Sequence, residues 1–182
     1  MAARDKVRSL VIASSSVLPV PADACVGWGE YADRTAAQGP DLQVGQAWRH
    51  ETTRAEAIRT APTNLWNPEA LPDSLARLGQ VRFSSDWARP WKVGVLPDPR
   101  LERPVEALAA TGISVLLLHG EYDMTFPRHL VDQTLVELPG SQAVGLRDAG
   151  HMAHVGQPVS WISAVEDFLR QRDPVTHVKM RA

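Results

Sequence analysis

The sequence predicts an α/β fold with three mainly parallel strands and flanking helices, and three observations predict it. First, residues 7–13 (VRSLVIA) are apolar and rich in β-branched side chains, which is typical of a buried strand. Second, a long stretch rich in proline and tryptophan follows, up to about Arg103. Third, the pattern from Pro104 onwards alternates helix, strand, helix, strand and helix with short links, which favours parallel βαβ units with right-handed crossovers.

Length and composition limit the protein to one sizeable core. The chain has 182 residues, of which 44% are hydrophobic and 22% charged, and a net charge of −2. These values are typical of a globular protein, and no run of Lys or Arg indicates a nucleic-acid surface. No apolar run is long enough to cross a membrane. The single cysteine, Cys25, and the absence of a signal-peptide pattern predict a cytoplasmic protein without disulfides.

Residues 17–103 are expected to form an irregular, mostly helical insert. They hold most of the 14 prolines and five of the six tryptophans, which are Trp28, Trp48, Trp66, Trp87 and Trp91. The stretch VGQAWRHETTRAEAIRTA predicts a helix that stops before Pro62. The stretch NPEALPDSLARLG predicts a second helix, capped by Asn67 or Asp73 and closed by Gly79. We expect no strand in this region.

The last third of the chain predicts regular elements. RPVEALAATG predicts a helix that ends at Gly112, and ISVLLLHG predicts a strand that is apolar on both faces. FPRHLVDQTLVELPG predicts a helix, and SQAVGLRDAGH contains a further strand. QPVSWISAVEDFLRQ predicts the final helix with an amphipathic stripe of Trp161, Ile162, Val165, Phe168 and Leu169.

Candidate catalytic side chains follow the last two predicted strands. Asp123 follows ISVLLLHG, and His151 follows QAVGLRDAG. Because the carboxyl ends of parallel strands meet at one edge of a sheet, we expect these residues to lie close together. A carboxylate that accepts a hydrogen bond from an imidazole fixes its tautomer and stabilises the imidazolium, as in the acid–base half of a Ser-His-Asp triad. Met124 and Phe126 are expected to line or back a pocket at this site.

Other interpretations of these residues remain open. Asp123 is also a residue type that is common in turns for local hydrogen bonding. Asp148 either orients His151 or shapes its loop. His151 and His154 are spaced as metal ligands with Asp148 nearby, but no third dedicated ligand is evident. We therefore predict no metal and no cofactor.

Two motifs resemble a known family. LLLHGEYDMTFP followed by LRDAGHMAHVGQP closely resembles the C-terminal part of the α/β-hydrolase family, in which the acid lies in a G-x-x-D turn and the histidine in a loop after the last strand. The resemblance implies an incomplete α/β-hydrolase fold. Residues 1–16 and 104–182 would form the C-terminal part of its core, and residues 17–103 the cap or lid. It also implies that Asp123 is the acid and His151 the base.

The sequence departs from the family at the nucleophile. The family's serine lies in a G-x-S-x-G elbow between a strand and a helix, and no serine of this sequence fits that pattern. The resemblance thus implies part of a serine hydrolase of ester, amide or short-peptide bonds, with its nucleophile outside this chain and little activity alone. The alternatives are a non-catalytic binding remnant, or a relative that uses an aspartate nucleophile for dehalogenation or epoxide hydrolysis.

The resemblance also predicts the partners. The substrate would be a small ester or amide. The strand at residues 7–13 would pair on both sides in a whole hydrolase, so its exposed edge would bind a missing N-terminal half or another copy of the chain. No nucleic-acid or membrane partner is expected.

Overall fold

A single parallel sheet organises the structure, a computed structural model that describes residues 7–39, 50–83 and 102–172. Its strands have the order β1-β2-β3, with bounds β1 (Ser9–Ala13), β2 (Ser114–Gly120) and β3 (Gln142–Leu146). Ser9 lies opposite Ser114, and Leu116 lies opposite Gln142. The predicted three-stranded parallel architecture is confirmed. The first strand begins two residues later than predicted, and the side chain of Val7 before it is 44% exposed.

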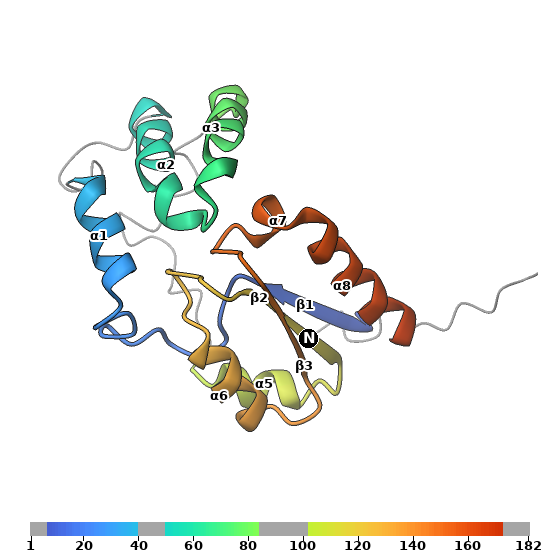
Figure 1. The fold of residues 1–182 in the computed structure, drawn as a ribbon. Coiled ribbons are helices and arrows are strands. Elements are labelled where there is room, and N and C mark those ends of the chain that lie inside the picture. The colour runs from blue at the N-terminus through green and yellow to red at the C-terminus, as the bar shows by residue number, and fades with distance from the viewer. Residues whose placement is uncertain (1–6, 40–49, 84–101, 173–182) are drawn as a thin grey trace, which may run out of the picture.

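Helices cover both faces of the sheet (Figure 1). They are α5 (Pro104–Ala109), α6 (His129–Glu137), α7 (Ala153–Gly156) and α8 (Pro158–Arg172). Successive residues of a strand point to opposite faces. Leu116 and Leu118 therefore pack in a cluster with Phe168 of α8, whereas Leu117 packs with Val105 and Val131 on the α5 and α6 side. This arrangement buries β2 on both faces, as its apolar sequence predicted.

The apolar stripe of α8 is narrower than the sequence predicted. Phe168 is 2% exposed, and Trp161 and Val165 pack against its cluster. Ile162 and Leu169, in contrast, are 52% and 44% exposed. The sheet beneath α8 has three strands in the part of the chain that the structure describes, so it covers the middle of the stripe and leaves its flanks uncovered.

Between β1 and α5, the described residues form what we call the helical insert: α1 (Gly29–Gln38), α2 (His50–Asn64), the 3₁₀-helix η2 (Pro68–Ala70) and α3 (Leu71–Gln80). Figure 1 shows them grouped to one side of the sheet. Buried side chains are few here; among the described residues of the insert they are Ala61, Leu65 and Ser74. No helix of the described ranges is long and apolar enough to cross a membrane.

The insert helices differ in detail from the prediction. Helix α2 passes through Pro62 and ends at Asn64. A proline removes one amide donor, but the amide of Leu65 still donates to the carbonyl of Ala61 at 3.0 Å, so the last turn survives. Residues 44–49 of that prediction, and Trp48, Trp87 and Trp91, lie outside the described residues.

The second predicted helix is divided into two elements. Asn67 caps η2, because its side chain accepts a hydrogen bond from the amide of Glu69 at 2.9 Å. Helix α3 then continues through Gly79 to Gln80, so Gly79 does not close it, and Asp73 lies in its first turn rather than at its cap. Gly79 has no left-handed backbone conformation, which is the property that would make it a helix terminator.

Candidate active site

Asp123 lies in the turn after β2 and is 1% exposed. Its Oδ1 atom accepts hydrogen bonds from the backbone amides of Thr125 at 2.8 Å and Phe126 at 2.9 Å. A local turn of this kind is what an aspartate often forms. Here it also fixes the direction of the carboxylate, so that Oδ2 faces the loop after β3, which contains His151.

His151 lies in the loop after β3, and its Nδ1 atom is 3.2 Å from Oδ2 of Asp123. Its side chain is 26% exposed, whereas that of Asp123 is fully buried. The ring of Phe126 lies 5.7 Å from the imidazole and is roughly stacked with it. The structure thus brings together the two residues that the sequence singled out, in a contact that can orient the imidazole.

The acid loop, residues 121–128 between β2 and α6, and the histidine loop, residues 147–152 between β3 and α7, are in contact through their backbones. The amide of Tyr122 donates to the carbonyl of Ala149 at 2.9 Å, and the amide of Glu121 donates to that of Leu146 at 3.0 Å. A Cβ atom on Gly120 would lie 2.2 Å from the carbonyl oxygen of Gly150. A glycine is therefore required at residue 120 by the close approach of the two loops rather than by its own backbone angles.

A second histidine approaches Asp123 from within the sheet. His119 of β2 is 2% exposed, and its Nδ1 atom is 3.9 Å from Oδ2 of Asp123. Burial lowers the pKa of His119, and the charge of Asp123 opposes that shift without reversing it. Its Nε2 atom has no hydrogen-bond partner among the described residues. Burial thus favours the neutral form of His119 beside the acid, a contact that the sequence did not predict.

A cavity of about 530 Å³ opens beside His151. It is enclosed by the end of β1, the helical insert and the histidine loop, and its lining residues are Ala13, Ser14, Ala57, Thr60, Ala61, Asn64, Leu78, His151, Met152 and His154. Ser14 is the serine in this lining, and its backbone φ is +46°. The cavity is mostly apolar with the imidazoles of His151 and His154 in its wall, and small-molecule sites often combine an apolar lining with a few polar groups.

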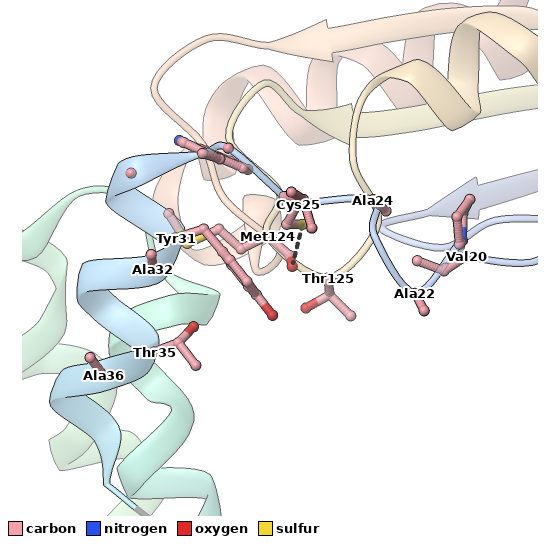
Figure 2. A pocket seen from close by; sticks show the side chains of 15 residues that line it. Val20, Ala22, Ala24, Cys25, Tyr31, Ala32, Thr35, Ala36, Met124 and Thr125 are labelled. Carbon is pink, nitrogen blue, oxygen red and sulfur yellow. Dashed lines mark hydrogen bonds between the residues drawn. The ribbon is translucent and has the colours of Figure 1, made fainter.

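A second cavity, of about 750 Å³, lies between the β1–α1 connection, α1 and the acid loop (Figure 2). Met124 lines it, whereas Phe126 lies against His151 instead. Cys25 also lines it and donates to the carbonyl of Met124 at 3.6 Å. Burial, and then the charge of Asp123, raise the pKa of the Cys25 thiol. A thiol with a raised pKa is a poor nucleophile at neutral pH.

The alternative metal-site interpretation concerns His151, His154 and Asp148. His154 faces Trp161 edge-on at 6.3 Å between ring centres. Asp148 is exposed and takes a left-handed backbone conformation with φ of +53°, so it shapes the loop. No group of three or more His, Cys, Asp or Glu side chains in the described ranges could hold a metal ion.

One contact between the insert and the acid loop was missed by the sequence analysis. The rings of Trp66 and Tyr122 are stacked at 3.8 Å with an interplanar angle of 10°. The two residues are far apart in the sequence, and no local pattern pairs them. Trp66 thus connects the insert to the loop that contains Asp123.

Comparison with known proteins identifies the fold. No protein-family model and no curated protein matches the sequence. The structure resembles an esterase from Thermogutta terrifontis (20% identity, TM-score 0.59, 93% of this chain and 58% of that one). It also resembles naproxen esterase from Bacillus subtilis (16%, 0.54, 92% and 53%) and an α/β fold family hydrolase from Bacillus anthracis (11%, 0.56, 94% and 60%). The chain thus spans little more than half the length of these proteins.

Proposed function

We propose that the chain carries the acid and base of a Ser-His-Asp triad in a serine hydrolase. The proposal starts from the fold, which is that of the C-terminal part of an α/β hydrolase. The observation that carries this proposal is the 3.2 Å contact between Nδ1 of His151 and the buried carboxylate of Asp123. The substrate class is an ester, amide or short-peptide bond. Carboxylic esters are favoured, since two of the three similar structures named above are esterases.

The proposed mechanism follows from the two ring nitrogens of His151. Nδ1–H donates to Asp123, which leaves Nε2 unprotonated and able to take the proton of an attacking serine hydroxyl. The serine oxygen bonds to the carbonyl carbon, and the buried carboxylate stabilises the imidazolium that forms. The imidazolium then protonates the leaving alcohol or amine as the acyl-enzyme forms. A water molecule, deprotonated by His151, then attacks the acyl carbon. The bond between that carbon and the serine oxygen breaks, the serine takes back the proton from His151, and the acid is released.

The nucleophile, in this proposal, comes from sequence outside the chain. The sequence contains no G-x-S-x-G motif. Ser14 shares the cavity with His151, but no helix follows it directly as in a nucleophile elbow. In the part of the chain that the structure describes, no hydrogen bond joins its hydroxyl to His151. We therefore propose that the 182-residue chain alone has little or no hydrolytic activity.

The helical insert would act as the cap over the site, with residues 17–103 as its extent and residues 1–16 and 104–182 as the core. The cavity beside His151 supports this role, because its walls come from the insert, from β1 and from the histidine loop together. Its apolar lining suits the acyl or alcohol part of a small ester.

The free edge of β1 would receive the part that carries the nucleophile. β1 pairs with β2, and its other edge has no strand partner among the described residues. An open strand edge invites pairing with another chain. We expect the isolated chain to self-associate, which light scattering coupled to gel filtration would detect. A stable monomer over a wide concentration range would contradict this part of the proposal.

The test compares the 182-residue chain with a chain extended by translation of the DNA upstream of Met1, using a p-nitrophenyl ester. The chain alone should remain at the background rate. The extended chain should hydrolyse the ester, and His151→Ala or Asp123→Asn should lower kcat at least about 10³-fold. Ser14→Ala should have little effect in the extended chain.

Three outcomes would overturn the proposal. Turnover by the 182-residue chain that Ser14→Ala abolishes would place the nucleophile within this sequence. Turnover by the extended chain that survives His151→Ala would remove His151 as the base. An upstream sequence without a G-x-S-x-G would remove the serine mechanism, and an aspartate at the elbow would point to dehalogenation or epoxide hydrolysis.

A further inference from the structure

The turn that ends α2, residues 64–66, lies against both loops of the proposed acid–base pair. On one side, the ring of Trp66 stacks on Tyr122 of the acid loop at 3.8 Å. On the other side, the carbonyl of Asn64 accepts a hydrogen bond from the amide of Met152 in the histidine loop at 2.8 Å. One short segment of the insert thus contacts the residue that precedes Asp123 and the residue that follows His151.

The contact with the histidine loop is a close backbone approach. A Cβ atom on Gly150 would lie 2.9 Å from the amide nitrogen of Trp66 and 3.0 Å from the carbonyl oxygen of Asn64. Leu65, between them, is 2% exposed. The turn and the loop therefore fit together without intervening side chains, and displacement of the turn would move the loop.

Arg34 of α1 fixes the turn from the insert side. Its guanidinium donates to the carbonyls of Pro62 at 2.8 Å, Leu65 at 2.7 Å and Trp66 at 3.1 Å. Helix α2 has no basic residue of its own in its last turn. Arg34 therefore binds one carbonyl that the helix end leaves unpaired, that of Pro62, and two in the turn just beyond it. The guanidinium carbon is also 4.9 Å from the centre of the Trp66 ring, a distance typical of a cation–π contact.

His151 is anchored differently on its two sides. Before it, Ala149 is bonded to the acid loop through the amide of Tyr122 at 2.9 Å. After it, the amide of Met152 is bonded to Asn64 of the insert. The imidazole therefore stands between a contact made within the sheet region and a contact made by the insert, and its direction depends on both.

We propose that Trp66 is a positioning residue for the Asp123–His151 pair: stacked on Tyr122 and held by Arg34, it fixes the turn that orients the histidine loop. This inference rests on the proposed function, because it takes Asp123 and His151 as the acid and base. In this proposal, the hydrogen bond between Asp123 and His151 depends on contacts from the insert as well as from the sheet region. The insert therefore does more than line a cavity.

Proton NMR of the 182-residue chain tests the inference through the hydrogen-bonded Nδ1–H of His151, which resonates far downfield of the amides. The wild type should show this resonance, and Asp123→Asn should remove it. Trp66→Ala should broaden the resonance or remove it, whereas Trp66→Phe, which keeps an aromatic ring for the stack, should retain most of it.

Phe83→Ala is the matched control. Phe83 also lies beneath a guanidinium, with the ring centre 5.8 Å from Arg54, and it follows α3 in the same region of the chain. Its loss should leave the His151 resonance unchanged. If Trp66→Ala unfolds the insert, Tyr122→Leu removes the same stack from the acid-loop side and should weaken the resonance in the same way.

The outcomes separate this inference from the proposed function. A wild type without the resonance, or a resonance that persists in Asp123→Asn, would overturn the acid–base pair itself. A resonance that Asp123→Asn removes but that stays undiminished in folded Trp66→Ala or Tyr122→Leu would overturn the positioning role and leave the pair intact. Equal loss in Trp66→Ala and Phe83→Ala would also overturn the positioning role.

Discussion

Different interactions stabilise the sheet region and the helical insert. Strand β2 is buried between two apolar clusters, one against α8 and one against α5 and α6. The described part of the insert buries three side chains, and one of them is the polar Ser74. Its contacts include the hydrogen bonds of Arg34 and the stack of Trp66 on Tyr122. The sheet therefore depends mainly on apolar burial, and the insert on a few polar and aromatic contacts.

The proposed acid–base pair lies where these two regions meet. Asp123 is fixed by amides of its own turn, which belongs to the sheet region. His151 is bounded by one contact to each region. The comparison predicts that damage to the sheet costs global stability, whereas damage to the insert disturbs the position of His151 first. Four predictions test this difference.

The largest effect is expected from Phe168→Ala in α8. Phe168 is 2% exposed within the cluster that contains Leu116 and Leu118, so its truncation leaves a cavity and should lower the free energy of unfolding by about 3–5 kcal/mol. Urea denaturation followed by circular dichroism measures the change. Leu169→Ala on the same helix is the control, since Leu169 is 44% exposed. Equal losses from the two variants would contradict burial as the main force in the sheet region.

Gly120→Ala should have the next largest effect, at the junction of the two loops. The added Cβ would lie 2.2 Å and 2.5 Å from two backbone carbonyl oxygens of the histidine loop. The loops must therefore separate, at a cost of about 1–3 kcal/mol, and the Nδ1–H resonance of His151 should disappear. Gly79→Ala is the control, because its Cβ would meet nothing within 4 Å and should stabilise α3 by about 0.5–1 kcal/mol. A Gly120→Ala protein of unchanged stability would show that the loops approach less closely than described.

Arg34→Gln should loosen the insert while the sheet stays intact. The variant loses the charge-assisted bonds to three carbonyls at the end of α2, and its local opening free energy should fall by about 1–3 kcal/mol. Hydrogen exchange should accelerate in α2 and at Met152 but not in β2. Arg170→Gln is a suitable control, since the Arg170 side chain is 67% exposed and its ion pairs should contribute less than about 1 kcal/mol. Faster exchange throughout β2 would mean that insert and sheet open as one unit.

The smallest effect concerns His119 and pH. Burial holds the folded-state pKa of His119 below its ordinary value of 6.5, so below that pH the unfolded chain binds a proton more readily than the folded chain. The contribution of His119 is therefore intact above pH 6.5 and is lost as the pH falls through 6.5 toward the lowered pKa. His119→Gln should lose less stability than the wild type between pH 7 and pH 5.

Several groups act on His119, and the control must separate them. Asp123, Arg128 and His151 all exert a charge effect on it, and the Phe126 backbone contacts it. All four remain in His119→Gln, so the difference in slope belongs to residue 119. His129→Gln, which changes an exposed histidine, should follow the wild-type slope. Identical slopes for His119→Gln and the wild type would show that His119 is not held neutral by burial.

The sheet region could be predicted from the sequence because its signals are local. A double-sided apolar strand, short links and glycine or proline at helix ends specify parallel strands, and parallel strands place Asp123 and His151 at one edge. The positions of helix ends were less predictable. Pro62 did not end α2, since a proline removes one amide donor and the amide of Leu65 still donates to the carbonyl of Ala61 in the last turn.

The contacts of the insert could not be predicted because they are not local. Trp66 and Tyr122 are brought together by the way the insert packs on the sheet, and neither residue shows this in its own neighbourhood. The same holds for His119, whose approach to Asp123 follows from the turn geometry. Ile162 and Leu169 fit a helical stripe in the sequence, but whether a stripe is covered depends on the width of the sheet beneath it.

The close approaches at Gly120 and Gly150 have a consequence for engineering. The Cβ excluded at residue 120 would meet the backbone of residue 150, and the Cβ excluded at residue 150 would meet the backbone of residues 64–66. The backbones of three segments from distant parts of the chain are thus in direct contact, with no side chain between them. An insert transplanted from a protein of similar fold would need a turn of the same shape at this point, whatever the arrangement of its helices elsewhere. An exchange of insert sequences should therefore keep Asn64 to Trp66 and Arg34, which binds this turn, and vary the remainder.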